Sequence, residues 1–184
     1  MKKKYISLWI TLLLTSLESQ VTSQEEIIEN YIFYHIEKNN SEAALGFLKN
    51  FISVNPGKGW FIMGNLFLSG IGLERNIEKA NECFFKSSSL GFIPAFNALG
   101  DSYLSGDGIV KDTKMALFYY KYAAKRGYGP SQFNAGCLFK NGDENLPRNL
   151  KEGFYWLDKA SKNTALGDLR KDAENLRDTI TLPR

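Results

Sequence analysis

The sequence predicts an all-α protein, a right-handed α/α superhelix of three helix–turn–helix repeats between terminal capping helices. Glycines recur at a spacing of 36 residues in two parallel sets: Gly64, Gly100, Gly136 and Gly70, Gly106, Gly142. A glycine inside a helix costs about 1 kcal/mol relative to alanine, so its repetition in register indicates a structural requirement. Apolar residues between these glycines follow a helical period, and no strand-like alternation stands out. A fixed period of about 20–50 residues is typical of stacked-repeat solenoids.

The first 23 residues have the order of a secretory signal peptide. Three lysines follow Met1, a mostly apolar run extends from Tyr5 to Leu17, and small residues end at Ser23. The apolar run is shorter than the roughly 20 residues that a membrane-spanning helix needs. We therefore expect cleavage near Ser23-Gln24, a periplasmic or secreted protein, and no stable membrane insertion afterwards. An uncleaved anchor and a first core helix remain alternatives.

The composition suits a folded protein with little excess charge. Hydrophobic residues make up 43% of the chain and aromatic residues 14%, which is ample for a packed core. The formal net charge is +3, and removal of residues 1–23 lowers it to about +1 because three lysines and Glu18 leave with them. We find no lysine or arginine stripe along the sequence, so we predict no nucleic-acid partner.

The elements follow in order after the predicted leader. Residues 24–56 are expected to form an N-terminal cap of two helices, 25–38 and 41–54, joined at Asn39-Asn40. Residues 57–163 contain the three repeats, at about 59–93, 95–129 and 131–163. Residues 164–184 are expected to form a C-terminal cap, whose helix covers about 165–179. Its predicted core-facing residues are Leu166, Leu169, Ala173 and Leu176.

Each repeat carries the same internal signals. The mid-helix glycine should allow the first helix to approach its partner closely, and the second glycine should end that helix. Asn76, Asp112 and Asn149 lie where an N-cap side chain accepts the first free amides of the second helix. Further signals are glycines that end the second helix and prolines that start the next repeat: Gly91, Gly127, Pro94 and Pro130.

These residues resemble the Sel-one-like repeat (SLR) family, which is related to tetratricopeptide arrays. The second repeat carries the pattern Ala95-x3-Leu99-Gly100-x2-Tyr103-x2-Gly106-x-Gly108-Ile109-x2-Asp112-x3-Ala116-x2-Tyr119-Tyr120-x2-Ala123-Ala124-x2-Gly127. The first repeat is similar at Gly64, Phe67, Gly70, Gly72, Lys79, Ala80, Lys86 and Gly91. The third is similar at Gly136, Phe139, Gly142, Trp156, Lys159 and Ala160. It departs from the pattern at Glu144, which replaces a loop glycine, and by one inserted residue near Leu146-Pro147.

The resemblance implies a scaffold or adaptor for protein–protein contact. Exported bacterial members of the family take part in host interaction, in envelope functions, and as immunity proteins that neutralise a periplasmic toxic effector. A cysteine-rich branch of the family has been linked to β-lactam binding and hydrolysis. The two cysteines of this chain do not follow the pattern of that branch.

The two cysteines are expected to be free and largely buried. Cys83 falls in the second helix of the first repeat and Cys137 in the first helix of the third. The helix pair between them should hold their backbones beyond disulfide reach. A bridge remains the alternative reading, because exported proteins often pair an even number of cysteines.

Residues suited to catalysis are sparse, and we predict no catalytic, cofactor-binding or metal site. The one histidine, His35, lies in the N-terminal cap, far along the sequence from either cysteine. Two cysteines and one histidine leave a structural zinc site short of ligands. No Ser-x-x-Lys motif occurs, and the glycine pairs of the loops follow helices, whereas nucleotide-binding glycine loops follow strands.

The predicted partner-binding surface lies beside the core stripe of each first helix. These positions vary between repeats, and in superhelical arrays first helices line a concave groove. The candidate residues are Phe61, Asn65, Leu68, Asn97, Asp101, Leu104, Phe133 and Lys140. Some of these residues could instead pack against the adjacent repeat, because the rotation of each helix does not follow from the sequence.

We therefore interpret the chain as a non-catalytic protein-interaction module exported to the periplasm, with an immunity role as its specific form. The alternatives are a secreted virulence or envelope scaffold and a β-lactamase-like hydrolase. The sequence leaves the identity of the partner and the oligomeric state open.

Overall fold

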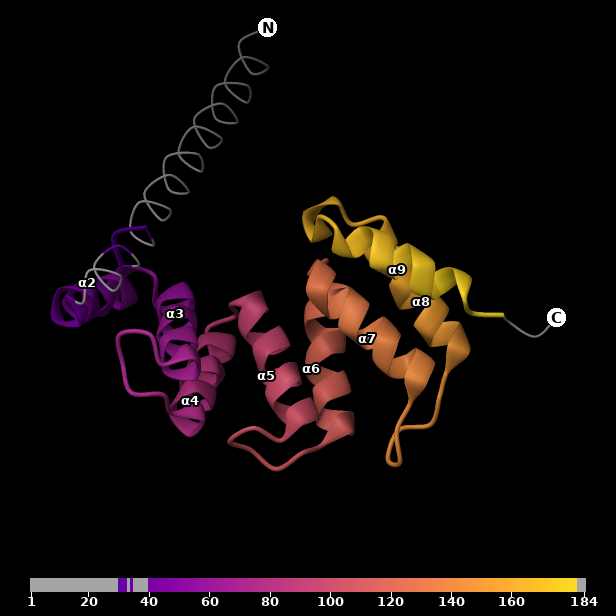
Figure 1. Cartoon of the computed structure of the whole chain (residues 1–184), viewed down its shortest axis with the longest axis horizontal. Coiled ribbons are helices and arrows are strands. Elements are labelled where there is room, and N and C mark those ends of the chain that lie inside the picture. The colour runs from indigo at the N-terminus through magenta and orange to yellow at the C-terminus, as the bar shows by residue number, and fades with distance from the viewer. Residues whose placement is uncertain (1–29, 33, 35–39, 182–184) are drawn as a thin grey trace, which may run out of the picture.

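The computed structural model describes residues 30–32, 34 and 40–181. This part of the chain is helical, and it contains no strand beyond an isolated bridge between Asp143 and Leu146. The helices in order are α2 (Ser41–Val54), α3 (Pro56–Ser69), α4 (Ile77–Ser89), α5 (Ile93–Ser105), α6 (Thr113–Lys125), α7 (Gly129–Asn141), α8 (Leu150–Ser161), the 3₁₀ turn η1 (Thr164–Leu166) and α9 (Leu169–Asp178). The predicted all-α solenoid is confirmed (Figure 1).

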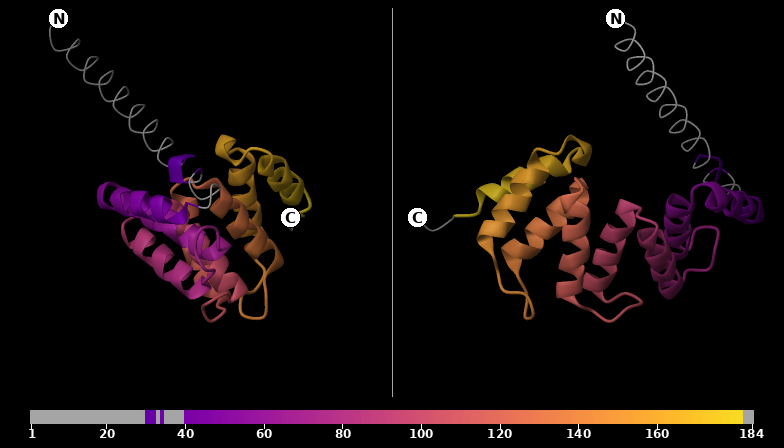
Figure 2. Two further views of the ribbon diagram at one scale, coloured as in Figure 1. Left: turned by 60° about the vertical axis from the view of Figure 1, so that its left-hand side comes forward. Right: turned by 180° about the vertical axis from the view of Figure 1, so that it is seen from behind.

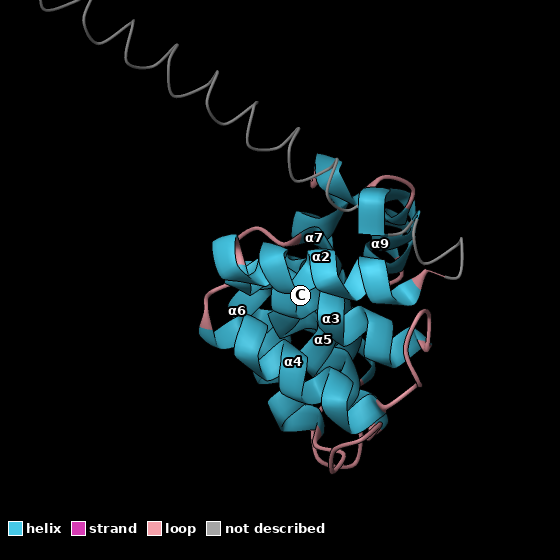
Figure 3. Cartoon of the chain, turned by 90° about the vertical axis from the view of Figure 1, so that its left-hand side faces the viewer, coloured by secondary structure: helices cyan, strands magenta, loops and turns pink. Residues whose placement is uncertain are grey.

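The helices form three stacked pairs, with α2 at one end of the stack and α9 at the other (Figure 1). Each pair consists of a first helix (α3, α5 or α7) and a second helix (α4, α6 or α8). The pairs follow one another along an arc, as the views in Figure 2 show. Seen from the N-terminal end, the helices of successive pairs lie one behind another (Figure 3). Each repeat therefore contacts chiefly its neighbours, as expected for a solenoid.

The mid-helix glycines lie where first and second helices are in closest contact. A Cβ atom on Gly64 would lie 2.5 Å from the ring of Phe84, and one on Gly100 would lie 2.5 Å from the ring of Tyr120. A Cβ on Gly136 would lie 2.7 Å from Cγ of Leu157. These separations are shorter than a carbon–carbon contact allows, so the predicted role of this glycine set in close packing is confirmed.

The predicted helix ends are confirmed as well. Gly70 and Gly106 end α3 and α5 with φ angles of 73° and 83°, in the left-handed region that glycine enters without strain. The side chains of Asn76, Asp112 and Asn149 each accept a backbone N–H three residues later, at 2.8, 3.0 and 3.0 Å. These bonds satisfy amides that would otherwise lack a partner at the start of each second helix.

Only part of the predicted N-terminal cap lies in the described region. The predicted helix 41–54 is confirmed as α2, and Asn40 caps it by accepting the N–H of Ala43 at 3.3 Å. Of the predicted helix 25–38, Asn30–Ile32 and Tyr34 are described, and these residues are helical. The predicted leader, residues 1–23, and His35 lie outside the described residues. No helix of the described ranges has both the length and the apolar character needed to cross a membrane.

The C-terminal cap differs from the single helix that was predicted for 165–179. Gly167 adopts a φ of 55° and a ψ of −130°, which separates η1 from α9. The break lets Leu166 turn into the core, where it is 7% exposed beside Leu157 and Ala173. The prediction that Leu169 shares this buried face is wrong, since that side chain is 42% exposed.

The loop between α7 and α8 is organised by Asp143. Its Oδ1 accepts the N–H groups of Asn145 and Leu146, both at 2.8 Å, and its Oδ2 accepts the hydroxyl of the buried Thr113. These bonds, the one from Thr113 first, hold the pKa of Asp143 below its usual range. Leu146 is thereby placed in the core between the second and third repeats. Asp143 thus links the inserted loop of the third repeat to α6.

Candidate functional site

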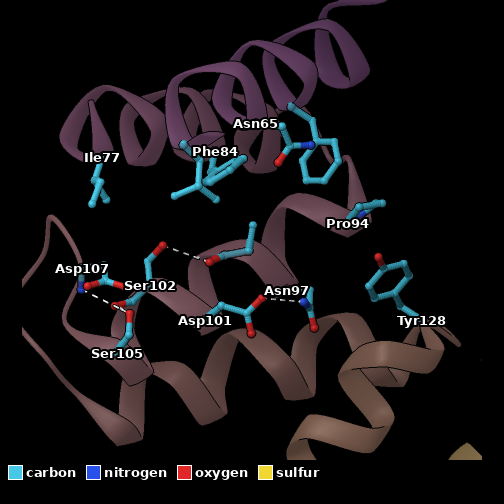
Figure 4. A pocket seen from close by; sticks show the side chains of 13 residues that line it. Asn65, Ile77, Phe84, Pro94, Asn97, Asp101, Ser102, Ser105, Asp107 and Tyr128 are labelled. Carbon is cyan, nitrogen blue, oxygen red and sulfur yellow. Dashed lines mark hydrogen bonds between the residues drawn. The ribbon is translucent and has the colours of Figure 1, made fainter. Parts of the chain in front are cut away.

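A pocket lies between the first and second repeats and is lined mainly by residues of α3, α4 and α5. Its volume is about 370 Å³. Helix α3 contributes Asn65 to one side, and α5 contributes Asn97 and Asp101 to the other (Figure 4). The described residues that line it are Phe61, Asn65, Leu68, Ile77, Phe84, Pro94, Asn97, Ala98, Asp101, Ser102, Ser105, Asp107 and Tyr128.

The carboxylate of Asp101 is the centre of a polar network in this pocket. Its Oδ1 accepts the hydroxyl of Tyr120 at 2.6 Å, and its Oδ2 accepts Nδ2 of Asn97 at 2.9 Å. The amide of Asn134 donates to Asn97 Oδ1 at 3.2 Å, and the hydroxyl of Ser131 donates to the same oxygen at 2.8 Å. Side chains from α5, α6 and α7 therefore fix the position of one carboxylate.

Burial and hydrogen bonding act in opposite directions on Asp101. Its side chain reaches solvent, but the surrounding pocket removes part of its hydration shell, and this raises the pKa of Asp101. The hydrogen bond from Tyr120 favours the ionised form and offsets part of that rise. Burial and the nearby Asp101 charge together raise the pKa of Tyr128, so that ring carries a neutral hydroxyl at neutral pH. The described lining residues include two carboxylates, Asp101 and Asp107, and no basic side chain.

Asn81 joins the helices that flank the pocket. Its side chain is 4% exposed on α4; Nδ2 donates to the backbone carbonyl of Asp107 at 2.8 Å, and Oδ1 accepts the hydroxyl of Ser102 at 2.6 Å. Because Ser102 and Asp107 line the pocket, Asn81 determines where these two residues lie relative to α4. Sequence reasoning missed Asn81, which occupies an ordinary polar position between two core residues of its helix.

Five of the eight residues predicted to bind a partner line this pocket: Phe61, Asn65, Leu68, Asn97 and Asp101.

The other three predicted residues lie elsewhere. Leu104 packs against the hydrophobic cluster between the second and third repeats, and Phe133 packs against the cluster of the C-terminal cap. Lys140 is half-buried and close enough to Cys137 to influence its titration. In α7 the residues that face Asn97 are instead Ser131 and Asn134. The C-terminal cap covers Phe133 and Cys137, whose counterparts in the earlier repeats line the pocket.

The thiols are poorly suited to nucleophilic chemistry. Both cysteines are free, as the sequence predicts; Cys83 is buried, whereas Cys137 is partly buried. Burial raises the pKa of Cys83 to about 11 and also raises the pKa of Cys137, so both are thiols at neutral pH. Among the described residues, no group of three or more histidine, cysteine, aspartate or glutamate side chains is placed to hold a metal ion.

We expect the titration of Asp101 to depend on Tyr120. In Tyr120→Phe the hydroxyl that favours the ionised carboxylate is absent, so the pKa of Asp101 should rise further above its usual value. Since the pKa of Asp101 is raised in the folded state, ionisation of this carboxyl opposes folding. Its contribution to the free energy of unfolding therefore becomes more favourable as the pH falls through that pKa. Carboxyl-carbon NMR titration of Asp101 in both proteins measures the shift. In Asp101→Asn this part of the pH dependence of unfolding should be absent. A lower pKa in Tyr120→Phe would contradict the assignment.

The stacked helix pairs, with glycines where the helices of a pair are in close contact and a pocket between two repeats, define an α/α solenoid. Solenoids of this class present extended binding surfaces. The particular family follows from three segments, 61–92, 95–128 and 129–164, which match the model of the Sel1 repeat and together make up more than half of the chain. The protein belongs to the Sel1 repeat family. Members of this family are generally protein-interaction scaffolds and are typically non-catalytic.

Two curated proteins are similar to part of this chain. Cytochrome c oxidase assembly factor 7A of Xenopus laevis is 27% identical over 130 residues, which are 67% of this chain and 56% of that protein. Chitin synthase regulatory factor 3 of Schizosaccharomyces pombe is 26% identical over 104 residues, 56% of this chain and 11% of that protein. The chain thus spans about half the length of the assembly factor and a small part of the regulatory factor.

Two solved structures share the fold. A Sel1 repeat protein from Oxalobacter formigenes aligns over 76% of this chain and 56% of its own, with a TM-score of 0.66 and 28% identity. A protective antigen of uropathogenic Escherichia coli that displays an SLR fold aligns over 76% of this chain and 32% of its own, with a TM-score of 0.64 and 19% identity. The second likeness concerns the fold alone.

Proposed function

We propose that the protein is a non-catalytic interaction module, exported to the bacterial periplasm, that binds a segment of another protein in the pocket between its first two repeats. The observation that carries this proposal is the pocket itself, in which four variable residues of two first helices lie around the fixed carboxylate of a fifth, Asp101. Phe61 and Tyr128 offer ring surfaces, and Asn65 offers both a donor and an acceptor.

The charge of the pocket favours a basic side chain on the partner. Asp101 and Asp107 line this space, and no basic side chain among the other described lining residues neutralises them. A lysine or arginine of the partner would pair with Asp101 and lie against the ring of Phe61 or Tyr128. Such a cation would also offset the desolvation that raises the pKa of Asp101.

The test makes the same substitution, asparagine to arginine, at two exposed positions, one in the pocket and one outside it. We expect Asn65→Arg, which places bulk and positive charge in the pocket, to weaken partner binding at least tenfold. Asn50→Arg makes the same exchange on α2, outside the pocket, and should leave binding unchanged. The measurement is affinity capture from the native cell envelope, followed by titration of the captured partner. Retention of that partner by Asn65→Arg, or capture of none, would contradict the proposal.

Export and the specific role are tested with the same native and variant proteins and the same affinity capture from the cell envelope. We propose an immunity protein because an exported, small and non-catalytic binder is suited to neutralising a toxic effector. A toxin captured by the native protein and not by Asn65→Arg would support this role, whereas an envelope component captured in the same pattern would favour a scaffold. Mass spectrometry of the periplasmic protein should give an N-terminus near Gln24 if the leader is cleaved.

A further inference from the structure

Helix α6 carries a stripe of basic side chains on its outer surface. Lys114, Lys121, Lys125 and Arg126 border a hollow of about 450 Å³, together with Leu117, Phe118 and Tyr122. The side chain of Phe118 is 57% exposed within this basic stripe. The expectation that the chain has no lysine or arginine stripe is therefore wrong. The sequence did not reveal the stripe because its members are spread over 13 positions and come together only on one face of the helix.

Among the described residues no ion pair neutralises the positive charge of this surface, although the carboxylate of Asp143 lies at Thr113, at the start of α6. Between Gly108 and Gly142 the sequence has six basic residues and one acidic residue, and the acidic residue, Asp112, caps α6. Within the described part of the chain, none of the four cations of the stripe forms an ion pair. Lys121 lies over the ring of Phe139 at 5.5 Å, and Arg126 lies over the ring of Tyr122 at 3.6 Å.

We propose that the basic stripe of α6 is a second docking surface, which binds an acidic segment of a protein with one apolar side chain on Phe118. This proposal goes beyond the pocket between the first two repeats and does not depend on it. From Lys114 to Arg126 the helix rises about 18 Å, the length of five or six residues of an extended peptide. Carboxylates at alternate positions of such a peptide would face the cations, and its apolar residue would enter the hollow beside Phe118.

The aromatic residues of the stripe disfavour a nucleic acid or a membrane as the occupant. The ring of Tyr122 is stacked on Phe96, with centroids 4.1 Å apart, and is also covered by Arg126. Phe118 meets the ring of Tyr119 edge-on and is the exposed ring of this stripe, at 57% exposure. Single-stranded nucleic acids instead bind to series of stacking rings. A membrane-binding surface requires a broad apolar face, but Leu117 is only 8% exposed and Tyr122 is half-buried.

The test measures binding of a defined probe to the complete protein. The probe is a fluorescent seven-residue peptide of six glutamates with a central phenylalanine, titrated at low and at physiological salt. We expect saturable binding that weakens with salt. It should fall at least tenfold in Lys114→Glu/Lys125→Glu, which reverses two exposed charges that form no ion pair with any described residue. Phe118→Ala should weaken binding of this probe and leave binding of an all-glutamate peptide nearly unchanged.

Matched controls separate this surface from net charge and from loss of folding. Lys49→Glu/Lys151→Glu changes the net charge equally at exposed positions of α2 and α8 and should bind the probe normally. Tyr155 is exposed and has in the third repeat the position that Phe118 has in the second. Tyr155→Ala is therefore the control for Phe118→Ala. Circular dichroism verifies that each variant is folded. The proposal is overturned if the native protein does not bind the probe, or if both charge reversals weaken it equally. It is also overturned if phosphatidylglycerol vesicles or an oligonucleotide bind more tightly than the peptide.

Discussion

Gly100→Ala is expected to destabilise the protein by about 1–3 kcal/mol, although alanine is the better helix former. The added Cβ would lie 2.5–3.0 Å from three atoms of the Tyr120 ring, which is 1% exposed and has little room to move. The ring must shift, and the shift disturbs the hydrogen bond from its hydroxyl to Asp101. Urea denaturation should show the loss, and the NMR-measured pKa of Asp101 should rise towards its value in Tyr120→Phe.

A second glycine provides the control for helix propensity. Gly46 lies in α2, and among the described residues no atom outside its own stretch of the helix comes within 4 Å of its Cβ position. Gly46→Ala should therefore stabilise the protein by about 0.5–1 kcal/mol. If close contact is the cause, the effect of Gly100→Ala should disappear in a background in which Tyr120 is already alanine. Equal destabilisation in the two backgrounds would show that the Tyr120 ring is not the reason for this glycine.

The repeat architecture could be predicted because its determinants are local and repeated. The side chain of each cap, such as Asn76 or Asp112, accepts the backbone N–H three residues later. Each helix-ending glycine ends its helix through its own positive φ angle. The close helix contact at Gly64 or Gly136 involves residues distant in the sequence, but it could be predicted because these glycines recur at a fixed period. Three copies of one pattern thus compensate for the uncertainty of any single position.

Positions without a counterpart in other repeats could not be predicted in the same way. Phe133 has the sequence register of a pocket residue, yet the C-terminal cap covers it, and no repeat pattern describes that cap. The break at Gly167 depends on Leu166 entering the core, which is a tertiary effect that overrides helix propensity. The side chain of Asn81 donates to the carbonyl of Asp107, 26 residues further along the chain. The position of Asn81 in the helical pattern therefore did not indicate this role.

The pocket therefore depends on a polar contact between repeats as well as on the variable residues of the first helices. Asn81 lies 4% exposed where α4 meets α5 and bonds to both Asp107 and Ser102. The loop at Gly108 also lies against this residue, since a Cβ there would be 3.0 Å from Asn81 Nδ2. The position of the pocket wall relative to α3 and α4 thus follows from one buried amide.

Asn81→Ala is expected to lower the free energy of unfolding by about 1–3 kcal/mol, because the carbonyl of Asp107 loses its donor. Asn81→Asp should be worse at neutral pH, since it places a carboxylate beside that carbonyl in a buried site. Its folded-state pKa should be raised, so the difference between the two variants should narrow as the pH falls through that value. Urea denaturation at several pH values measures both effects.

Asn175→Ala on the exposed face of α9 controls for the loss of an asparagine and should change stability by less than about 0.5 kcal/mol. Because Ser102 and Asp107 line the pocket, Asn81→Ala should also weaken partner binding under conditions in which the variant is fully folded. Binding to the basic stripe of α6 should be unchanged, since that surface lies on another helix. If Asn81→Ala weakened both kinds of binding equally, the effect would be a general loss of folded protein, and the specific role of Asn81 at the pocket would be wrong.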